Sequence, residues 1–546
     1  MKFLKLVTTA ALAINLASVA HAITPNASAP KGGVFNYNFD AEPESLHPIM
    51  GGDVYNTYFN NYVHDSMCAH DFNTWAYTPR LAEKWEVGKD GLSFTFFLRK
   101  DAYFHNGENV TAEDVKASLD AIREPKHQAF NVIPYYEKIA KAEVVDKYTI
   151  KFTASEKYFQ NLTSLCDMTI LPKSVYGNVD KSVKMQKEAI GAGPYMLTKY
   201  DKGQSITVKR NDKWYGWNVP ALKGWYNFDQ INFRFTKDDN ILVERLKKGD
   251  IDYAEFKSTD TFLKATGKPF KPKTVSQKFI GLAVKNEMPK SYGYIGFNFK
   301  DPILADKNVR LAFAHLVNRE EMNKKFAENL NDLATSPVAI HTAQSPDNKP
   351  IEFSPTKAKD LLTKAGWTDA DKNGILEKTI NGKKTELKLT FIYANKDSEK
   401  QWTIVKEDCK KAGIEIELKL LEWNTFIKNV DERQMQLWAM GWGGGDVEGD
   451  PKQLWHSSAA VKGGSNYGSY ANPEVDKLID EGRQELDVKK RNAIFKKVYG
   501  LIADDVPYVF LFNRKYEYYG MSNKVKSPGD TFKYDFGFRT WWAATK

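Results

Sequence analysis

Cysteine is scarce in this sequence, and the signatures of several common protein classes are absent. Its 546 residues include only three cysteines, Cys68, Cys166 and Cys409, and none of them has CxxC spacing. This pattern argues against a structural zinc site. The nine histidines are dispersed without an HExxH motif, and GxSxG, Walker A and dinucleotide-binding motifs are missing as well. We therefore predict no metal site and no cofactor, and we assign no catalytic residues.

Long apolar runs are lacking everywhere except at the N-terminus. There, Lys2 and Lys5 precede an apolar stretch at 6–19, and Ala20-His21-Ala22 has the small-x-small pattern of a signal-peptidase site. The stretch is too short to span a bilayer, and no cysteine follows it to receive a lipid. We predict a signal peptide at 1–22, cleaved after Ala22, that exports the protein to the periplasm of a Gram-negative bacterium.

Charge and length set further limits. The formal net charge is +9, but the basic residues are scattered and form no run, so we expect no nucleic-acid partner. The content of 42% hydrophobic and 27% charged residues is that of an ordinary folded protein. Because 546 residues exceed what one hydrophobic core usually serves, we predict two or more lobes.

Strand-like and helical segments alternate along the chain, which favours mixed α/β lobes. Asp90-Gly91 predicts the turn of a hairpin whose second strand contains residues 93–96, and Thr111 with Asp114 predicts a capped helix start. Other local signals predict a helix at 241–248 stopped by Gly249, a helix from Ser354 to Gly366, a strand at 414–420 and a helix starting at Asn472-Pro473.

Three blocks together resemble one protein family. They are residues 76–118, residues 191–218 (beginning GAGPY) and residues 306–314 (DKNVRLAFA). These blocks are similar to the extracellular solute-binding proteins of family 5, which deliver peptides and some nickel chelates or sugars to ABC importers. Residues 224–229 and Thr540-Trp541-Trp542 resemble the branch of long-peptide receptors associated with uptake of microcin C.

The resemblance implies an α/β fold of the two-lobed periplasmic-binding-protein type (type II, cluster C-like), with a hinge and a subdomain inserted in lobe I. We expect the hinge at 294–298 and 506–508. The expected division is lobe I at 23–69, 188–290 and 506–546, the inserted subdomain at 70–187, and lobe II at 291–505. Cys68 and Cys166 then fall in or beside the inserted subdomain, so any disulfide is expected between them.

The resemblance also implies the partners and a ligand-contact segment. The partners are an oligopeptide and the permease subunits of an inner-membrane ABC transporter, with the receptor itself a monomer. In the peptide-binding members, a tryptophan and a nearby aspartate line the pocket and hold the peptide amino terminus. The matching residues here are Trp442 and Asp446, although Asp450 competes with Asp446 because the spacing differs from that of the family.

Neighbouring residues add to this predicted site. Trp423 offers another broad wall, and Gly444 and Gly445 allow the backbone to pass close to a ligand. By position, the family resemblance also indicates Asn466, and Gly52 with Asp53 as an edge segment that pairs with the peptide main chain. A plain loop is an equally good interpretation of these last positions.

Residues 369–377 (DADKNGILE) begin like an EF-hand calcium loop. The pattern fails at its twelfth position, which is Ile380 instead of glutamate. A polar hairpin turn is the favoured interpretation, and a weak Ca²⁺ site stays open.

Two functional hypotheses remain. The first is a non-catalytic receptor for oligopeptides that closes about a hinge, with a nickel chelate, haem or oligosaccharide as the alternative ligand. The second is a secreted hydrolase of peptides or glycans.

Overall fold

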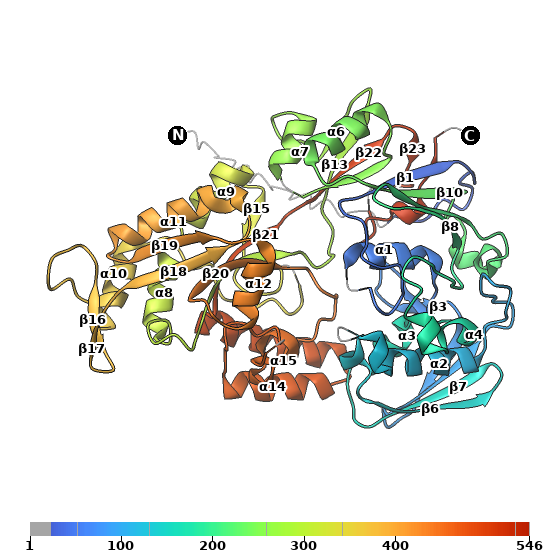
Figure 1. The fold of residues 1–546 in the computed structure, drawn as a ribbon, viewed down its shortest axis with the longest axis horizontal. Coiled ribbons are helices and arrows are strands. Elements are labelled where there is room, and N and C mark those ends of the chain that lie inside the picture. Colours follow the sequence, from blue (N-terminus) through green and yellow to red (C-terminus); the bar gives the residue numbers. More distant parts are fainter. Residues whose placement is uncertain are drawn as a thin grey trace, which may run out of the picture.

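The computed structural model describes residues 23–51, 53–129, 132–257, 259–340, 342–462, 464–529 and 531–544. The predicted signal peptide and Gly52 lie outside these residues. Two large sheets with their helices form two lobes, and a smaller sheet forms a subdomain beside the first lobe (Figure 1). Within the described residues, no helix has both the length and the apolar character needed to cross a bilayer.

Lobe I is built on an eight-stranded sheet of order β12-β13-β22-β11-β1-β10-β9-β8. The central strand β1 runs parallel to both of its neighbours. The strands of this sheet are β1 (Val34–Phe39), β8 (Tyr195–Asp201), β9 (Ser205–Arg210), β10 (Gln230–Phe235), β11 (Tyr253–Phe256), β12 (Lys273–Val275), β13 (Phe279–Val284) and β22 (Glu517–Ser522), with β23 (Val525–Lys526) and β24 (Trp542–Ala543) as a separate pair, and the helices are α1 (Val54–Val63), α6 (Asp239–Lys248) and α7 (Thr259–Thr266).

The inserted subdomain contains a four-stranded antiparallel sheet of order β4-β5-β7-β6. Its hydrophobic core is continuous with that of lobe I, so the two parts form one packed unit. The elements of this region are β2 (Cys68–His70), β3 (Tyr77–Pro79), β4 (Ala82–Val87), β5 (Ser93–Leu98), α2 (Ala112–Arg123), β6 (Ile139–Asp146), β7 (Thr149–Ala154), α3 (Asn161–Asp167), α4 (Lys173–Tyr176) and α5 (Val179–Ser182).

Lobe II is built on a six-stranded sheet of order β15-β21-β14-β20-β18-β19. Its elements are β14 (Tyr292–Phe297), α8 (Lys307–His315), α9 (Arg319–Ala327), β15 (Asn331–Leu333), α10 (Pro355–Lys364), β16 (Glu377–Ile380), β17 (Lys383–Glu386), β18 (Lys388–Tyr393), α11 (Glu399–Lys411), β19 (Glu415–Leu420), α12 (Trp423–Asp431), β20 (Leu437–Trp442), α13 (Lys452–Trp455), α14 (Pro473–Gln484), α15 (Val488–Asp505) and β21 (Tyr508–Arg514). The β16–β17 hairpin lies at the outer end of this lobe (Figure 1).

The local signals read from the sequence are confirmed. The carboxylate of Asp114 accepts a hydrogen bond of 2.9 Å from the backbone N–H of Thr111, closing the predicted capping box of α2. Gly249 ends α6 with a φ of 73°, a conformation that suits glycine. The turn at Asp90-Gly91 joins β4 to β5, and Asn472 caps α14.

The crossings between the lobes differ from the predicted hinge. Strand β21 pairs with β14 and β15 in lobe II, whereas β22 pairs with β11 and β13 in lobe I. The return crossing therefore lies at 515–516, not at 506–508, and 508–514 is a lobe II strand. The first crossing lies at 285–291, ahead of the predicted 294–298, because β13 ends in lobe I and β14 begins in lobe II.

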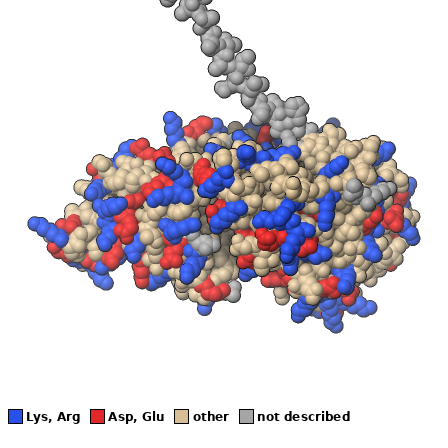
Figure 2. All heavy atoms as spheres, turned by 90° about the horizontal axis from the view of Figure 1, so that it is seen from above, with Lys and Arg blue, Asp and Glu red and all other residues tan. Residues whose placement is uncertain are grey.

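A disulfide joins Cys68 to Cys166, which confirms the expected pairing, and Cys409 is a buried free thiol. The bond ties β2 to helix α3 and closes a chain segment with a sequence separation of 98. The surface charges are mixed, as the sequence suggests. Figure 2 shows basic and acidic side chains interspersed along the visible face of both lobes.

Candidate ligand-binding site

Trp442 stands at the end of strand β20, beside the chain crossing between the lobes. It is paired with Tyr292 of β14, the first strand after that crossing. Its indole stacks on the ring of Tyr467 with a centroid distance of 5.7 Å and an interplanar angle of 9°, and lies 6.5 Å from Tyr294 at 14°. These contacts hold the indole as a rigid apolar wall.

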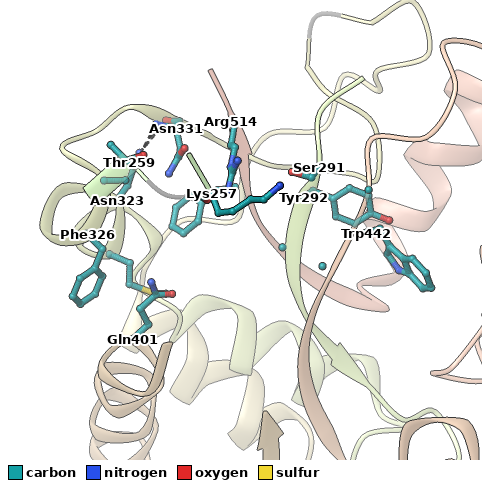
Figure 3. A pocket seen from close by; sticks show the side chains of 16 residues that line it. Lys257, Thr259, Ser291, Tyr292, Asn323, Phe326, Asn331, Gln401, Trp442 and Arg514 are labelled. Carbon is teal, nitrogen blue, oxygen red and sulfur yellow. Dashed lines mark hydrogen bonds between the residues drawn. The ribbon is translucent and has the colours of Figure 1, made fainter. Parts of the chain in front are cut away.

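A cavity of about 530 Å³ opens beside Trp442 and receives residues from both lobes. This volume lies within the range of small-molecule and peptide pockets. Lobe I supplies Lys257 and Thr259, while lobe II supplies most of the remaining wall. Figure 3 shows Trp442 and Tyr292 on one side of the cavity and Asn323 and Phe326 on the other, with the Lys257 side chain extending between them. The position of the cavity means that hinge motion changes its shape.

Two cations of this cavity, Lys257 and Arg514, were not predicted from the sequence. The ammonium of Lys257 lies 3.3 Å from Asp40 and 3.4 Å from Glu255, and Arg514 lies 3.3 Å from Glu517. Burial alone would lower the pKa of Lys257, but these two carboxylates raise it, so the ammonium stays charged. Neither Lys257 nor Arg514 belongs to a recognisable motif, and only the folded chain brings them to the cavity.

Two glycines after Trp442, Gly444 and Gly445, allow a backbone path that residues with a Cβ atom would not. A Cβ on Gly444 would stand 2.0 Å from the carbonyl oxygen of Pro289, so only glycine lets this segment pass the crossing chain. Gly445 has a φ of 69° and open space around its Cα. The segment therefore turns sharply and presents the next residue, Asp446, to solvent.

The two competing aspartates have different surroundings. Asp450 is engaged: its carboxylate lies 2.8 Å from Nε of Arg483 and accepts a hydrogen bond of 2.9 Å from the Tyr158 hydroxyl. Asp446 is exposed and accepts a weak hydrogen bond of 3.4 Å from the backbone N–H of Glu448. Within the described residues no basic side chain forms an ion pair with Asp446. Its charge is therefore available to a ligand.

Asp446 faces the inserted subdomain. Partial removal from water, followed by the negative charge of Asp446, raises the pKa of Asp167 to about 7. Asp167 lies at the end of α3, and its carboxylate is 3.9 Å from the ring of His70. Burial lowers the pKa of His70, which keeps this imidazole neutral at neutral pH. Asp446 of lobe II and Asp167 of the inserted subdomain are therefore two acidic groups that lie close to each other.

The remaining predicted residues have other surroundings. Asn466 is buried, and its amide donates to the carbonyls of His456 and Tyr470 and accepts from the N–H of Tyr470. The side chain of Asn466 therefore holds its own loop, and its contact with a ligand stays a prediction. Trp423 begins α12, is 54% exposed and stacks on Phe426.

The predicted edge segment is not a strand in the structure. Asp53 caps α1, accepting a hydrogen bond of 2.8 Å from the N–H of Asn56, and its other oxygen accepts one of 3.1 Å from the N–H of Glu44. Gly51 and Asp53 lie outside the strands, and Gly52 is not among the described residues. The carboxylate of Asp53 is thus used within its own helix and the preceding loop, and main-chain pairing of a peptide with this segment stays a prediction.

Comparison with known proteins places this geometry in context. Residues 76–464 match the family model described as "Bacterial extracellular solute-binding proteins, family 5 Middle". Over 560 aligned residues the chain is 28% identical to the oligopeptide-binding protein AppA of Bacillus subtilis, covering 98% of this chain and 97% of AppA.

Solved structures show the same fold. AppA of Bacillus subtilis in complex with a nonapeptide superposes with a TM-score of 0.75 at 25% identity, covering 95% of this chain and 100% of that one. NikZ of Campylobacter jejuni in complex with Ni(L-His) gives a TM-score of 0.75 at 23% identity, covering 93% and 99%. The predicted two-lobed α/β fold is therefore confirmed.

Proposed function

Because this chain belongs to the bacterial extracellular solute-binding proteins of family 5, we propose that it captures oligopeptides between its lobes and delivers them to an ABC importer. The observation that carries this proposal is the exposed carboxylate of Asp446, which follows the aromatic wall of Trp442 in the chain and acts on Asp167 of the inserted subdomain. A peptide offers one constant positive group, its α-ammonium. A fixed anion beside a wall that tolerates varied side chains suits such a ligand.

The surroundings favour Asp446 over Asp450 as the anchor. Arg483 already neutralises Asp450, and placing an ammonium there would require breaking a well-formed ion pair. Asp446 instead lies near enough to Asp167 to raise the pKa of that carboxyl group. An ammonium between them would relieve their repulsion and would contact both lobes at once. A ligand that contacts both lobes shifts the hinge equilibrium towards the closed form.

The ligand class follows from the relatives. AppA of Bacillus subtilis is an oligopeptide-binding protein, and its structure holds a nonapeptide. The cavity beside Trp442 carries apolar rings, so it can receive apolar side chains, while its two cations are already paired with carboxylates of the protein. We infer binding without catalysis, export by cleavage after Ala22, a monomeric receptor in the periplasm, and an inner-membrane ABC permease as its partner.

Native mass spectrometry with a nonapeptide library tests the proposal. We expect intact peptides to be retained on the protein, and calorimetry should show that acetylating the peptide amino terminus weakens binding by a hundredfold or more. Steady cleavage of the library would instead establish a hydrolase. Binding of a nickel–histidine chelate, haem or an oligosaccharide with no retained peptide would replace the peptide with that ligand.

The contribution of Asp446 to peptide binding is tested with one variant and a matched control. Asp446→Asn keeps the size of the side chain and removes its charge, so it should abolish the difference between free and acetylated peptides. Glu422→Gln, on the same lobe, serves as the charge-matched control. If Asp446→Asn still discriminates between the two peptides, the amino terminus binds elsewhere.

A further inference from the structure

Three acidic side chains meet at the outer end of lobe II, far from the proposed peptide site. Asp369, Asp371 and Glu377 each offer a carboxylate oxygen, and these oxygens lie within 4.8 Å of one another. Two oxygens on opposite sides of a Ca²⁺ ion stand about 4.6–5.2 Å apart, twice the usual Ca–O distance. The cluster therefore has the dimensions of a calcium site, at the base of the β16–β17 hairpin (Figure 1).

Two of these oxygens are buried without a partner. Glu377 is only 6% exposed, and its Oε2 accepts no hydrogen bond. The Oδ1 atom of Asp369 is likewise buried and without a partner. Desolvating a carboxylate oxygen without a donor is unfavourable. A cation in the cluster would satisfy both oxygens at once.

The loop holds the cluster in place through its backbone. The N–H of Gly374 donates a hydrogen bond of 3.1 Å to Asp369, and that of Asn373 donates one of 3.2 Å to Asp371. The N–H of Ala370 donates one of 3.0 Å to Glu377. Each acid thus has one oxygen fixed by the loop, so the carboxylates are oriented before any ion arrives.

The geometry also explains why the EF-hand pattern stops before its twelfth position. The chain enters strand β16 at Glu377, the ninth position of the pattern, instead of continuing into a helix. Glu377 pairs across the hairpin with Glu386 and forms an isolated bridge with Thr368. The buried acid therefore comes from the ninth position, and Ile380 at the twelfth is not needed as a ligand.

Lys384 competes for the same acids. Its ammonium lies 2.9 Å from Asp371 and 3.6 Å from Glu377. One ammonium balances only one of the three negative charges, and it leaves the two buried oxygens of Asp369 and Glu377 unpaired. Lys384 is 58% exposed on its side chain, so it can swing into solvent when a divalent cation arrives.

We propose that Asp369, Asp371 and Glu377 bind a calcium ion that fastens the β16–β17 hairpin to lobe II. The donors are all oxygen atoms on an irregular loop, a set that suits Ca²⁺ better than Mg²⁺ or a transition metal. Water would complete the coordination. The affinity should be that of an extracellular module, with a Kd on the order of 10⁻⁴ to 10⁻³ M. The site does not depend on the peptide proposal.

Terbium luminescence tests the site in the full-length protein. Trp367 is buried two residues before Asp369 and can transfer excitation energy to a bound Tb³⁺ ion. We expect saturable sensitised emission that millimolar CaCl₂ displaces and equal MgCl₂ does not. Without saturable emission from either the unmodified protein or Lys384→Gln, there is no calcium site.

Variants separate the site from general electrostatic attraction. Asp371→Asn, on an exposed residue, should weaken Ca²⁺ competition by tenfold or more, and so should Glu377→Gln if circular dichroism shows that it folds. Lys384→Gln should strengthen it, because the competing ammonium is gone. Glu415→Gln removes an exposed, lysine-paired carboxylate of the same lobe and should leave Ca²⁺ competition unchanged. Equal effects from Asp371→Asn and Glu415→Gln would overturn the proposal.

Discussion

The hydroxyl of Tyr158 donates a hydrogen bond of 2.9 Å to the carboxylate of Asp450, so the inserted subdomain is tied to lobe II at the edge of the proposed peptide site. Phe159 follows Tyr158 into the core of lobe II, where its ring lies 6.0 Å from that of Phe495. Its backbone N–H donates a hydrogen bond of 2.9 Å to the carbonyl of Arg483. This contact joins the lobes independently of the hinge.

Weakening this contact should weaken peptide binding without touching the peptide. Tyr158→Phe removes a hydrogen bond to a charged group, worth about 1.5–3 kcal/mol. The closed form loses that energy and the open form does not, so peptide affinity should fall by roughly 10- to 100-fold. Calorimetry measures the loss, and small-angle scattering should show a larger radius of gyration.

The control for this variant is Tyr103→Phe, which alters an exposed tyrosine of the same subdomain and should change neither quantity. If Tyr158→Phe changes neither the peptide affinity nor the radius of gyration, the contact of Tyr158 and Phe159 with lobe II persists in the open form.

The two aspartates near Trp442 should separate binding from stability. Asp446→Asn should weaken peptide binding by about 2–5 kcal/mol, because the peptide ammonium loses its anion. Asp450→Asn should instead destabilise the fold by about 3–5 kcal/mol, because Arg483 is left in a mostly buried position without its partner, and any loss of affinity through the weakened Tyr158 contact should be equal for free and acetylated peptides. Calorimetry with a free-amine peptide and thermal unfolding distinguish the two effects. The reverse result would make Asp450 the ligand anchor.

Local chemistry explains which features could be predicted from the sequence. The capping box of Thr111 and Asp114 and the stop at Gly249 depend on residues within one helical turn, so the sequence contains all the information they need. Asp53 and Asn466 are different. Each was assigned by position in a motif, but an aspartate or asparagine can equally cap a helix or tie a loop, and only the three-dimensional neighbours decide between these roles.

Long-range pairing explains what the sequence could not show. Strand β21 could extend either sheet, and its pairing with β14 depends on residues about two hundred positions away. Lys257 reaches the cavity from lobe I, directly after β11, and Arg514 reaches it from the last residue of β21 in lobe II. Neither follows from spacing along the chain.

Peptide binding should release protons near neutral pH. With a pKa of about 7, Asp167 is half protonated at that pH. A peptide ammonium beside it would favour the ionised form, so binding should release roughly half a proton at pH 7. Calorimetry in buffers of different ionisation enthalpy measures the release, and Asp167→Asn should abolish it. Equal release from the variant would assign the proton to another group.

The carboxyl group of Asp167 also makes the stability of the peptide-free protein depend on pH. Its pKa in the folded state, about 7, lies above the value near 3.9 expected in the unfolded chain. The folded state therefore binds more protons between these two values. The contribution of Asp167 to stability is present below pH 4 and is lost as the pH rises through 7. Thermal melting from pH 4 to 8 should show a flatter profile for Asp167→Asn.

Reducing the disulfide should destabilise the inserted subdomain and not lobe II. The Cys68–Cys166 bond closes a segment with a sequence separation of 98, and opening such a loop in the unfolded chain costs about 2–5 kcal/mol of stability. Dithiothreitol should therefore lower the melting temperature, and Cys68→Ser should make the protein insensitive to it. Cys409→Ser serves as the control, since this thiol is buried in lobe II and burial raises its pKa. Its response to dithiothreitol should match that of the unmodified protein. A melting temperature that dithiothreitol leaves unchanged, in protein whose thiols are shown to be reduced, would mean that core packing alone holds β2 to α3.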